Sequence, residues 1–428
     1  MTADPTDEAM LDRLQRDAFN YFLKTYNPRN GLVADTNREG APCSIAVVGF
    51  ALSAYPVGVE RGWIERTDAV HRTLTALRFF MASDQSGSVH ATGYRGFYFH
   101  FLDMNLGTRV WLSEVSLIDT GILLAGVLTA ATYFDADTPE ERELRQLADA
   151  LYRRVDWRWS QRETGAVTHG WKPECGFLNY GWEGYSEAIL LYALGLGSPS
   201  HPLTDQSFSA WSSTYQWENL YGYDYLYAGP LFIHQFSHAW IDFRGIRDTF
   251  MREKNCDYFE NSRRATYVQR EYAMRNPGSF TGYSASSWGL SAGDGPQAET
   301  RTIAGRQQSF YGYAARGVPY GPDDGTICGS AVLSSLVFAP ELVLPALRTL
   351  ESRFSPDGIS VVRASGFNPT VAEAGPIGWI SQGEFGLDQG MIVIMIENFR
   401  TGLLWRLGRA NPFVQTGLRR AGFKGGWL

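Results

Sequence analysis

The chain has 428 residues, of which 44% are hydrophobic, so it can bury a large core and is not a disordered protein. Its 38 basic and 45 acidic residues give a formal net charge of -7, and no run of Lys or Arg resembles the basic surface that nucleic acid requires. Aromatic residues make up 14%, and many Trp and Tyr residues stand in polar, Gly-rich segments, where they could stack on carbohydrate.

Two kinds of helical segment alternate along the chain. Amphipathic segments such as 138–155 have apolar residues at helical spacing, and Thr138 and Pro139 supply a helix start signal there. They are expected at 7–25, 66–83, 138–155, 246–274, 340–354 and 410–422. Segments that are apolar on nearly every side, and must therefore be buried all round, are expected at 44–55, 113–134, 184–197, 227–242, 327–338 and 388–403.

This alternation predicts an all-α fold in one domain that spans residues 1–428. Six buried inner helices wrapped by six half-exposed outer helices form an (α/α)6 barrel. The connections 84–112, 156–182 and 276–325 are rich in Gly, Ser and aromatic residues and are too long to be simple turns. We expect these long loops, with a few short strands, to form a cleft at one end of the barrel. Residues 358–367 are the best candidate for a strand.

The sequence shows no sign of a membrane segment or a disulfide framework. No apolar stretch reaches membrane-spanning length, and the first residues lack the pattern of a secretory signal, which favours a cytoplasmic location. Cys43, Cys175, Cys256 and Cys328 lie far apart without metal-type spacing. Buried free thiols are therefore expected.

The first group of candidate site residues lies in the segment 109–126. Glu114 and Asp119 stand at the start of a buried helix that Ser113 or Ser116 could cap. Glu114 is either a capping acid, favoured by the helix dipole, or a functional carboxylate. Asp119 either binds a substrate hydroxyl or belongs to an internal hydrogen-bond network.

The second group is found in "GWEGYSEAILLYALGLG", residues 181–197. If the helix begins near Gly184, Glu183 lies at its rim and Glu187 lies one turn further in, on the same face. Glu187 could instead pair with an arginine. Partial desolvation beside tryptophan raises the pKa of a carboxyl, as a general acid at neutral pH requires, so Glu183 next to Trp182 is the predicted acid.

The third group comprises His234, Gln235, His238 and Asp242. His234, His238 and Asp242 follow one another at i+4 and could occupy one helical face. Two histidines at that spacing without a glutamate between them make a weak zinc signal. Hydrogen bonding to sugar hydroxyls or to neighbouring loops is the favoured interpretation, and no metal is expected.

The fourth group precedes the apolar run that begins at Met391. Trp379, Gln382, Glu384 and Asp388 are gathered there, and Asp388 could either cap the helix or work in a site. A phosphate-binding loop, a GxSxG elbow and a dinucleotide fingerprint are all missing. The repeated combination of carboxylates, aromatics and amides at the mouths of buried helices is typical of glycoside chemistry, which uses two carboxyl groups.

Four long motifs carry a family resemblance that covers about residues 8–408. "RGFYFHFLDMNLGTRVWLSEVSLIDTGILLAG", "GWEGYSEAILLYALGLGSPSHP", "GPLFIHQFSHAWIDFRGI" and "GLDQGMIVIMIENFRTGLLW" resemble the glucoamylase-like family of bacterial β-1,2-glucanases and the transglycosylase domain of cyclic β-1,2-glucan synthases. The resemblance implies an α/α barrel with a substrate cleft, Glu183 as general acid and Glu114 as base or nucleophile. By the same resemblance, motif positions that line the cleft are Asp119, Glu187, His234, His238 and Asp388.

These observations lead to one hypothesis and two alternatives. The hypothesis is a glycoside hydrolase that cleaves β-1,2-linked glucan or sophoro-oligosaccharides without a cofactor, with Glu183 as acid and Glu114 or Asp388 as its partner. The alternatives are a retaining β-1,2-glucan transglycosylase and a non-catalytic carbohydrate-binding protein. The aromatic residues expected to stack on sugar rings are Trp111, Trp171, Tyr180, Trp182, Tyr185 and Trp379.

Overall fold

The computed structural model describes residues 5–303, 305–355, 358–372 and 377–428, and it is rich in helix. The helices are α1 (Pro5–Lys24), α2 (Ile45–Glu60), α3 (Arg66–Ala82), α4 (Leu117–Tyr133), α5 (Pro139–Arg154), α6 (Ile189–Gly197), α7 (Ser207–Ser212), α8 (Thr249–Glu253), α9 (Tyr258–Arg275), α10 (Gly329–Ser334), α11 (Pro340–Phe354), α12 (Gly386–Arg400), α13 (Leu403–Ala410) and α14 (Pro412–Arg420). Two short 3-10 helices, η1 (Leu231–His234) and η2 (Phe236–Ala239), lie between α7 and α8.

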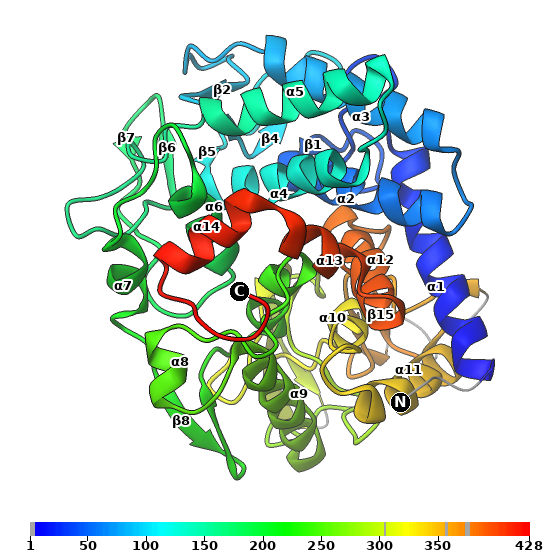
Figure 1. Ribbon diagram of the computed structural model, residues 1–428. Helices are drawn as coiled ribbons and strands as arrows, with labels where there is room; N and C mark the ends of the chain where they lie inside the picture. Colours follow the sequence, from blue (N-terminus) through cyan, green and yellow to red (C-terminus); the bar gives the residue numbers. More distant parts are fainter. Residues whose placement is uncertain (1–4, 304, 356–357, 373–376) are drawn as a thin grey trace.

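The buried helices contact one another in a closed circuit, which Figure 1 shows near the centre of the molecule. α2 packs on α4, α4 on α6, α10 on α12, and α12 returns to α2. The 3-10 helices bridge α6 and α10, because Ser237 donates a hydrogen bond to the Glu187 carbonyl and the Gln235 amide donates to the Ala331 carbonyl. Outside this circuit α1 packs on α12, α5 on α4, α14 on α6, α9 on η1 and α11 on α10. One buried core extends from Leu11 to Phe423.

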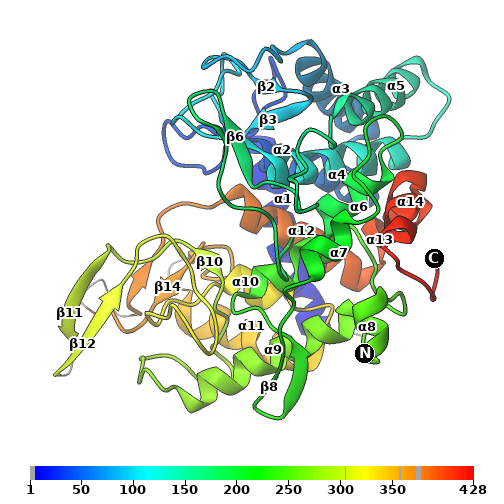
Figure 2. The same ribbon diagram turned by 90° about the vertical axis from the view of Figure 1, so that its left-hand side faces the viewer.

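The strands are short and antiparallel, and most of them gather at one end of the molecule. β2 (Gly93–Tyr94), β3 (Phe97–Phe99), β5 (Val115–Ser116), β6 (Gly170–Lys172) and β7 (Gly176–Phe177) form one sheet in that order. The two-stranded pairs are β1 (Cys43–Ser44) with β4 (Phe101–Leu102), β8 (Trp217–Leu220) with β9 (Tyr223–Leu226), β10 (Ala292–Gly293) with β13 (Ala314–Ala315), β11 (Glu299–Ile303) with β12 (Arg306–Phe310), and β14 (Phe367–Asn368) with β15 (Trp379–Ile380). In Figure 2 strands from the long connections lie on the left, away from the C-terminus.

The structure corrects three sequence-based expectations about elements. Residues 227–242 form two 3-10 helices instead of an α-helix, since the carbonyl of His234 accepts its hydrogen bond from Ser262 on α9. The segment expected to begin near Gly184 becomes helical only at Ile189, because Gly184 adopts a φ of 81°, outside the right-handed helical region. Over 358–366 the chain forms turns, and the neighbouring residues Val361 and Val362 are both fully buried, which excludes a half-buried strand.

Two further observations concern the cysteines and the membrane. Cys43, Cys256 and Cys328 are buried as expected, whereas Cys175 is exposed. Among the described residues, none of the helices combines the length and apolar character needed to cross a lipid bilayer.

The contact between α2 and α4 depends on glycine. A Cβ atom at Gly126 of α4 would collide with the carbonyl oxygen of Gly49 of α2, and a Cβ at Gly49 would collide with the backbone of α4 at Ile122. Gly121 lies one and a half turns earlier on α4, and a Cβ there would meet Leu191 at an ordinary 3.7 Å. The backbones of α2 and α4 therefore approach closely at Gly126, whereas there is room for a Cβ atom at Gly121.

We expect Gly126→Ala to lower the free energy of unfolding by about 1–3 kcal/mol, because overpacking outweighs the gain in helix propensity. The matched variant Gly121→Ala should leave stability unchanged or raise it by about 0.5–1 kcal/mol. Urea unfolding of both variants measures the difference. Equal stability of the two variants would contradict the close backbone approach.

Candidate active site

A cavity of about 640 Å³ lies among the ends of the buried helices, within the usual range for a small-ligand site. Its walls come from the first turns of α4 and α12, the segment before α6, the 3-10 helices and α10. Four carboxylates line it, namely Asp35, Asp119, Glu187 and Asp388. Among its described lining residues there is no Arg or Lys. A cavity of this charge suits an uncharged ligand rich in hydroxyl groups better than an anion.

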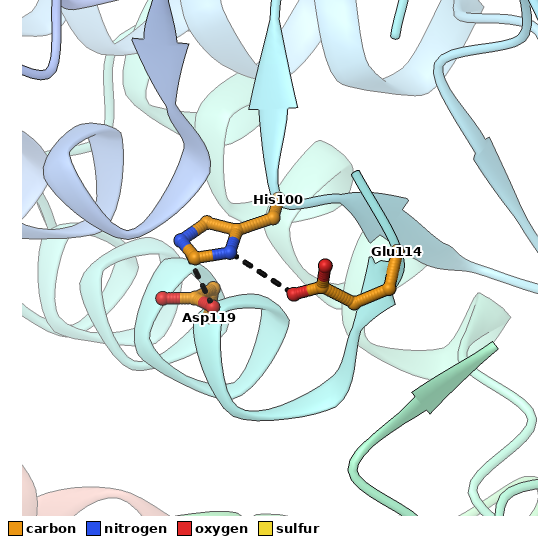
Figure 3. Close-up of side chains that lie close together, drawn as sticks. All are labelled: His100, Glu114 and Asp119. Carbon is orange, nitrogen blue, oxygen red and sulfur yellow. Dashed lines mark hydrogen bonds and ion pairs between the residues drawn. The ribbon is translucent and has the colours of Figure 1, made fainter. Parts of the chain in front are cut away.

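His100, between β3 and β4, is the basic side chain in the wall of this cavity. Figure 3 shows its ring between Glu114 and Asp119, with a different nitrogen facing each carboxylate. Nδ1 lies 3.0 Å from the Glu114 carboxylate and Nε2 lies 3.5 Å from that of Asp119. Burial disfavours the imidazolium, but the charges of the two carboxylates and the hydrogen bond to Glu114 outweigh it and raise the pKa of His100 to about 9. His100 is therefore protonated at neutral pH.

The contact with His100 also determines the ionisation of Glu114, and a contact with Ser116 holds the side chain of Asp119. Burial acts to raise the pKa of Glu114, but the hydrogen bond and charge of His100 prevail and lower it. Asp119 lies in the first turn of α4, where the hydroxyl of Ser116 donates to its carboxylate at 2.5 Å. Ser116 is also the N-cap of α4, since it accepts from the backbone N–H of Asp119. Ser116 is thus the cap, and Glu114 is not a capping acid.

Glu187 and Asp388 differ from Glu114 and Asp119 because neither forms an ion pair within the described part of the chain. Glu187 precedes α6, and burial raises its pKa to about 7. Asp388 lies in the first turn of α12 and accepts a hydrogen bond of 2.7 Å from Ser330. Burial raises the pKa of Asp388 to about 6 against the opposing effect of Ser330 and Ser365. At neutral pH Glu187 is therefore close to its pKa and about half protonated, whereas Asp388 is mostly ionised.

His100, Glu114 and Asp119 are close enough together to be considered as metal ligands. One ligand atom from each lies within 4.8 Å of the others. In the structure the two carboxylates face different nitrogens of the same ring. The arrangement suits a protonated histidine between two acids.

Glu183, the acid predicted from the sequence, does not line this cavity. Its side chain is exposed, so the expected desolvation beside Trp182 is wrong. The reason is the turn at Gly184, which places Glu183 and Glu187 in an irregular segment instead of on one helical face. Glu187, considered as an arginine partner from the sequence, lies in the cavity without such a partner among the described ion pairs.

The predicted histidines lie behind the cavity wall. His234 and His238 are buried, and burial lowers their pKa values to about 4 and about 3, so both are neutral. His234 donates to the Ala228 carbonyl at 3.1 Å, and His238 lies 3.0 Å from the Ser262 hydroxyl. Neither lines the cavity, so the expected contact with sugar is corrected to one with neighbouring segments. Gln235 does line it, while its amide nitrogen donates to α10.

The aromatic residues expected to contact sugar are distributed over several places, and none of them lines the central cavity. Trp171 stacks on Tyr94 at 4.7 Å, Trp182 lies against His169, and Tyr185 packs against His234 and Tyr258. Trp111 and Tyr180 are exposed. Trp379 and Gln382 line a second cavity of about 540 Å³ beyond β15. Trp171, Trp182 and Tyr185 are thus engaged in contacts with other rings, which composition alone does not record.

Sequence reasoning missed several residues of the cavity wall. Asp35 lies in a loop without periodic pattern, and burial raises its pKa to about 6. His100 stands in the first of the four family-like motifs, and a histidine beside "FYF" in a Gly-rich connection is a sequence signal that could have found it. The remaining walls come from the aromatic side chains Phe101, Phe232, Phe236, Tyr313 and Phe385 and the hydroxyl residues Ser291, Ser330, Ser334 and Ser365.

Several known proteins are similar to this chain. Residues 179–412 match a family model described as "Putative glucoamylase". A curated relative from Parabacteroides distasonis, named exo beta-1,2-glucooligosaccharide sophorohydrolase (non-reducing end), is 27% identical, and the match covers 97% of this chain. The chain spans 58% of the length of that relative.

Solved structures of similar proteins cover the full chain. A protein from Bacteroides uniformis described as a "putative glucoamylase" has a TM-score of 0.87 and 28% identity over 100% of both chains. An endo-beta-1,2-glucanase from Chitinophaga pinensis, in complex with sophorotriose and glucose, has a TM-score of 0.83 and 25% identity over 99% of both chains. A beta-1,2-glucanase from Parabacteroides distasonis has a TM-score of 0.82 and 25% identity, over 99% of this chain and 61% of that one.

The raised pKa of His100 leads to a stability prediction. A group whose pKa is higher in the folded than in the unfolded protein stabilises the fold below its unfolded pKa, and this contribution disappears as the pH rises through the folded pKa. The wild type should therefore exceed His100→Gln in free energy of unfolding most clearly near pH 6, and the difference should shrink by about pH 9.5, above the folded pKa of His100. Urea titrations at both pH values measure it. A constant difference would contradict a protonated His100.

Proposed function

The chain belongs to the glucoamylase-like family matched over residues 179–412, and from this premise we propose that it is a glycoside hydrolase that cleaves β-1,2-linked glucan or sophoro-oligosaccharides. The linkage rests on the relatives, which are named as a β-1,2-glucooligosaccharide sophorohydrolase and as β-1,2-glucanases. The chemistry rests on this chain's own cavity. The observation that carries the proposal is the presence of Glu187 and Asp388, both with raised pKa values, in a cavity whose described lining lacks Arg and Lys.

The proposal includes the finer architecture of the fold. The circuit of α2, α4, α6, η1 with η2, α10 and α12 is the inner ring of an (α/α)6 barrel, with the 3-10 helices in one inner place. The outer ring is formed by α1, α3, α5, α9, α11 and α14. A buried core that extends from Leu11 to Phe423 supports a single catalytic domain over 1–428.

Glu187 is the general acid in this proposal, in place of Glu183. A general acid must be protonated at the working pH and must face the substrate, and Glu187 meets both requirements with a pKa of about 7 and a place in the cavity wall. It would donate its proton to the glycosidic oxygen as the bond to the anomeric carbon breaks. Glu183, exposed and outside the cavity wall, is assigned to the rim.

Asp388 is the proposed second carboxylate, which either activates water or attacks the anomeric carbon. Its hydrogen bond from Ser330 favours the ionised form that either role needs. Asp119 lines the cavity beside His100, where its carboxylate oxygens can accept hydrogen bonds from sugar hydroxyls, and Glu114 faces the other nitrogen of the His100 ring. Glu187 is the donor and Asp388 the acceptor because the pKa of Glu187 is the higher of the two.

The wild-type protein should release reducing sugar from β-1,2-glucan and not from β-1,3-, β-1,4- or α-1,4-glucan. Glu187→Gln should lower kcat by about 10²- to 10⁴-fold, because proton donation is lost while the shape of the side chain is kept. Glu183→Gln should lower kcat far less than Glu187→Gln does. Chromatography of products with each glucan, together with far-UV circular dichroism of the variants, measures both expectations.

Each alternative has its own result in this assay. Cleavage of α-1,4-glucan alone would overturn the linkage, and binding without products from any glucan would leave a carbohydrate-binding protein. Long or cyclic products beside reducing ends would identify a transglycosylase. If kcat falls further in Glu183→Gln than in Glu187→Gln, Glu183 and not Glu187 is the general acid.

The pH profile of kcat/KM should be bell-shaped. Activity falls below about pH 6 as Asp388 takes up a proton, and it falls above about pH 7 as Glu187 loses its proton. Ser330→Ala removes a hydrogen bond to the ionised form of Asp388, so the acidic limb should move to higher pH while the alkaline limb stays in place. Initial rates on one soluble substrate between pH 4 and pH 9 measure this. An unmoved acidic limb would exclude Asp388 as the group that causes it.

A further inference from the structure

Trp111 and Leu112 are displayed on the surface by an unusual turn between β4 and β5. Their side chains are 69% and 68% exposed. Both residues have positive φ angles, 58° and 51°, a backbone region that residues other than glycine seldom occupy. Two large apolar side chains in such a turn gain nothing from burial, so core packing does not explain the turn.

The surrounding contacts fix this turn firmly. Arg109, whose side chain is 1% exposed, donates two hydrogen bonds to Glu174, at 2.6 and 3.1 Å. Its Nε donates to the Ser113 carbonyl at 2.5 Å, and the guanidinium lies 4.7 Å from the ring of Phe99. The N–H of Ser113 donates to the Val110 carbonyl and closes the turn. The backbone on both sides of Trp111 is therefore held in place.

A continuous row of rings connects Trp111 with the cavity. The Phe101 ring stacks on His100 with 3.9 Å between centroids and an interplanar angle of 15°. Trp111 lies 5.0 Å from Phe101 on the same row. His100 and Phe101 both line the cavity, whereas Trp111 lies outside it. A ligand that leaves the cavity over Phe101 meets Trp111 next.

We propose that Trp111 forms an outer subsite that stacks on a glucosyl unit of a chain whose reacting end lies in the cavity. The inference rests on the proposed function and adds a preference for chain length. The C–H face of a pyranose ring is apolar and packs on an exposed indole, while its hydroxyl groups remain in water. The occupant is the substrate itself, because the row of rings is continuous with the cavity. Substrates long enough to pass Phe101 bind more tightly than shorter ones.

Trp111→Ala should raise KM about tenfold for polymeric β-1,2-glucan and leave kcat unchanged, because a remote contact of this size is lost equally from the ground and transition states. For the shortest oligosaccharide that the wild type cleaves, both constants should remain as in the wild type. Initial rates on purified β-1,2-gluco-oligosaccharides of increasing length measure this. Tyr320→Ala is the matched control, since Tyr320 is 68% exposed and its hydroxyl bonds to Glu218 away from the cavity.

Glu174→Gln tests the positioning of the turn with Trp111 intact. The loss of the charged pair with Arg109 should produce a smaller rise in KM that also grows with chain length. If Trp111→Ala raises KM equally for all oligosaccharide lengths, or does not raise it for any length, the outer subsite is overturned even if the wild type cleaves β-1,2-glucan. A wild type that cleaves no β-1,2-linked substrate would overturn the proposed function, and the subsite with it.

Discussion

An α-helix that is buried on every side can keep charged side chains at low cost only near its ends, and the rest of this structure depends on that constraint. The interiors of α2, α4, α6 and α12 are almost wholly apolar and form the central circuit. Asp119 and Asp388 occupy the first turns of α4 and α12, where the helix dipole favours a negative charge. Glu187 lies directly before α6. The polar ends of the buried helices therefore meet in one cavity.

A single histidine, His100, divides the carboxyl groups in and beside that cavity into two kinds. Glu114 and Asp119 lie beside the protonated ring of His100 and form ion pairs with it. For Glu187, Asp388 and Asp35, burial raises the pKa. Like charges in a cavity of low polarity cannot all be ionised at small cost, so protons are retained where no cation is near. Within the second kind, the higher pKa of Glu187 and the lower pKa of Asp388 provide the proposed acid and base at one pH, without a metal ion or a cofactor in the proposed steps.

The irregular segments supply what regular helices could not. The two 3-10 helices bridge α6 and α10 through Ser237 and Gln235, and the buried neutral His234 and His238 bind backbone and Ser262 behind the wall. On the other side, the buried ion pair of Arg316 with Asp324 joins β10 and the segment that includes Tyr313. The turn at Trp111 is fixed in a comparable way by Arg109 and Glu174. Charged side chains with several hydrogen-bond partners thus shape the loops around the cavity.

The sequence by itself determined the helix-rich class, the alternation of buried and amphipathic helices and the presence of carboxylates, among them Asp119, Glu187 and Asp388, at or just before the starts of buried helices, because hydrophobic periodicity and carboxylates at helix starts are local properties. It also placed the short strands in the long connections. Only the tertiary structure decided that Glu187 faces the cavity and Glu183 faces solvent, because the turn at Gly184 breaks helical spacing. His100 and Asp35 joined the site, and His234 and His238 left it, through contacts between segments distant in sequence, which no local pattern records.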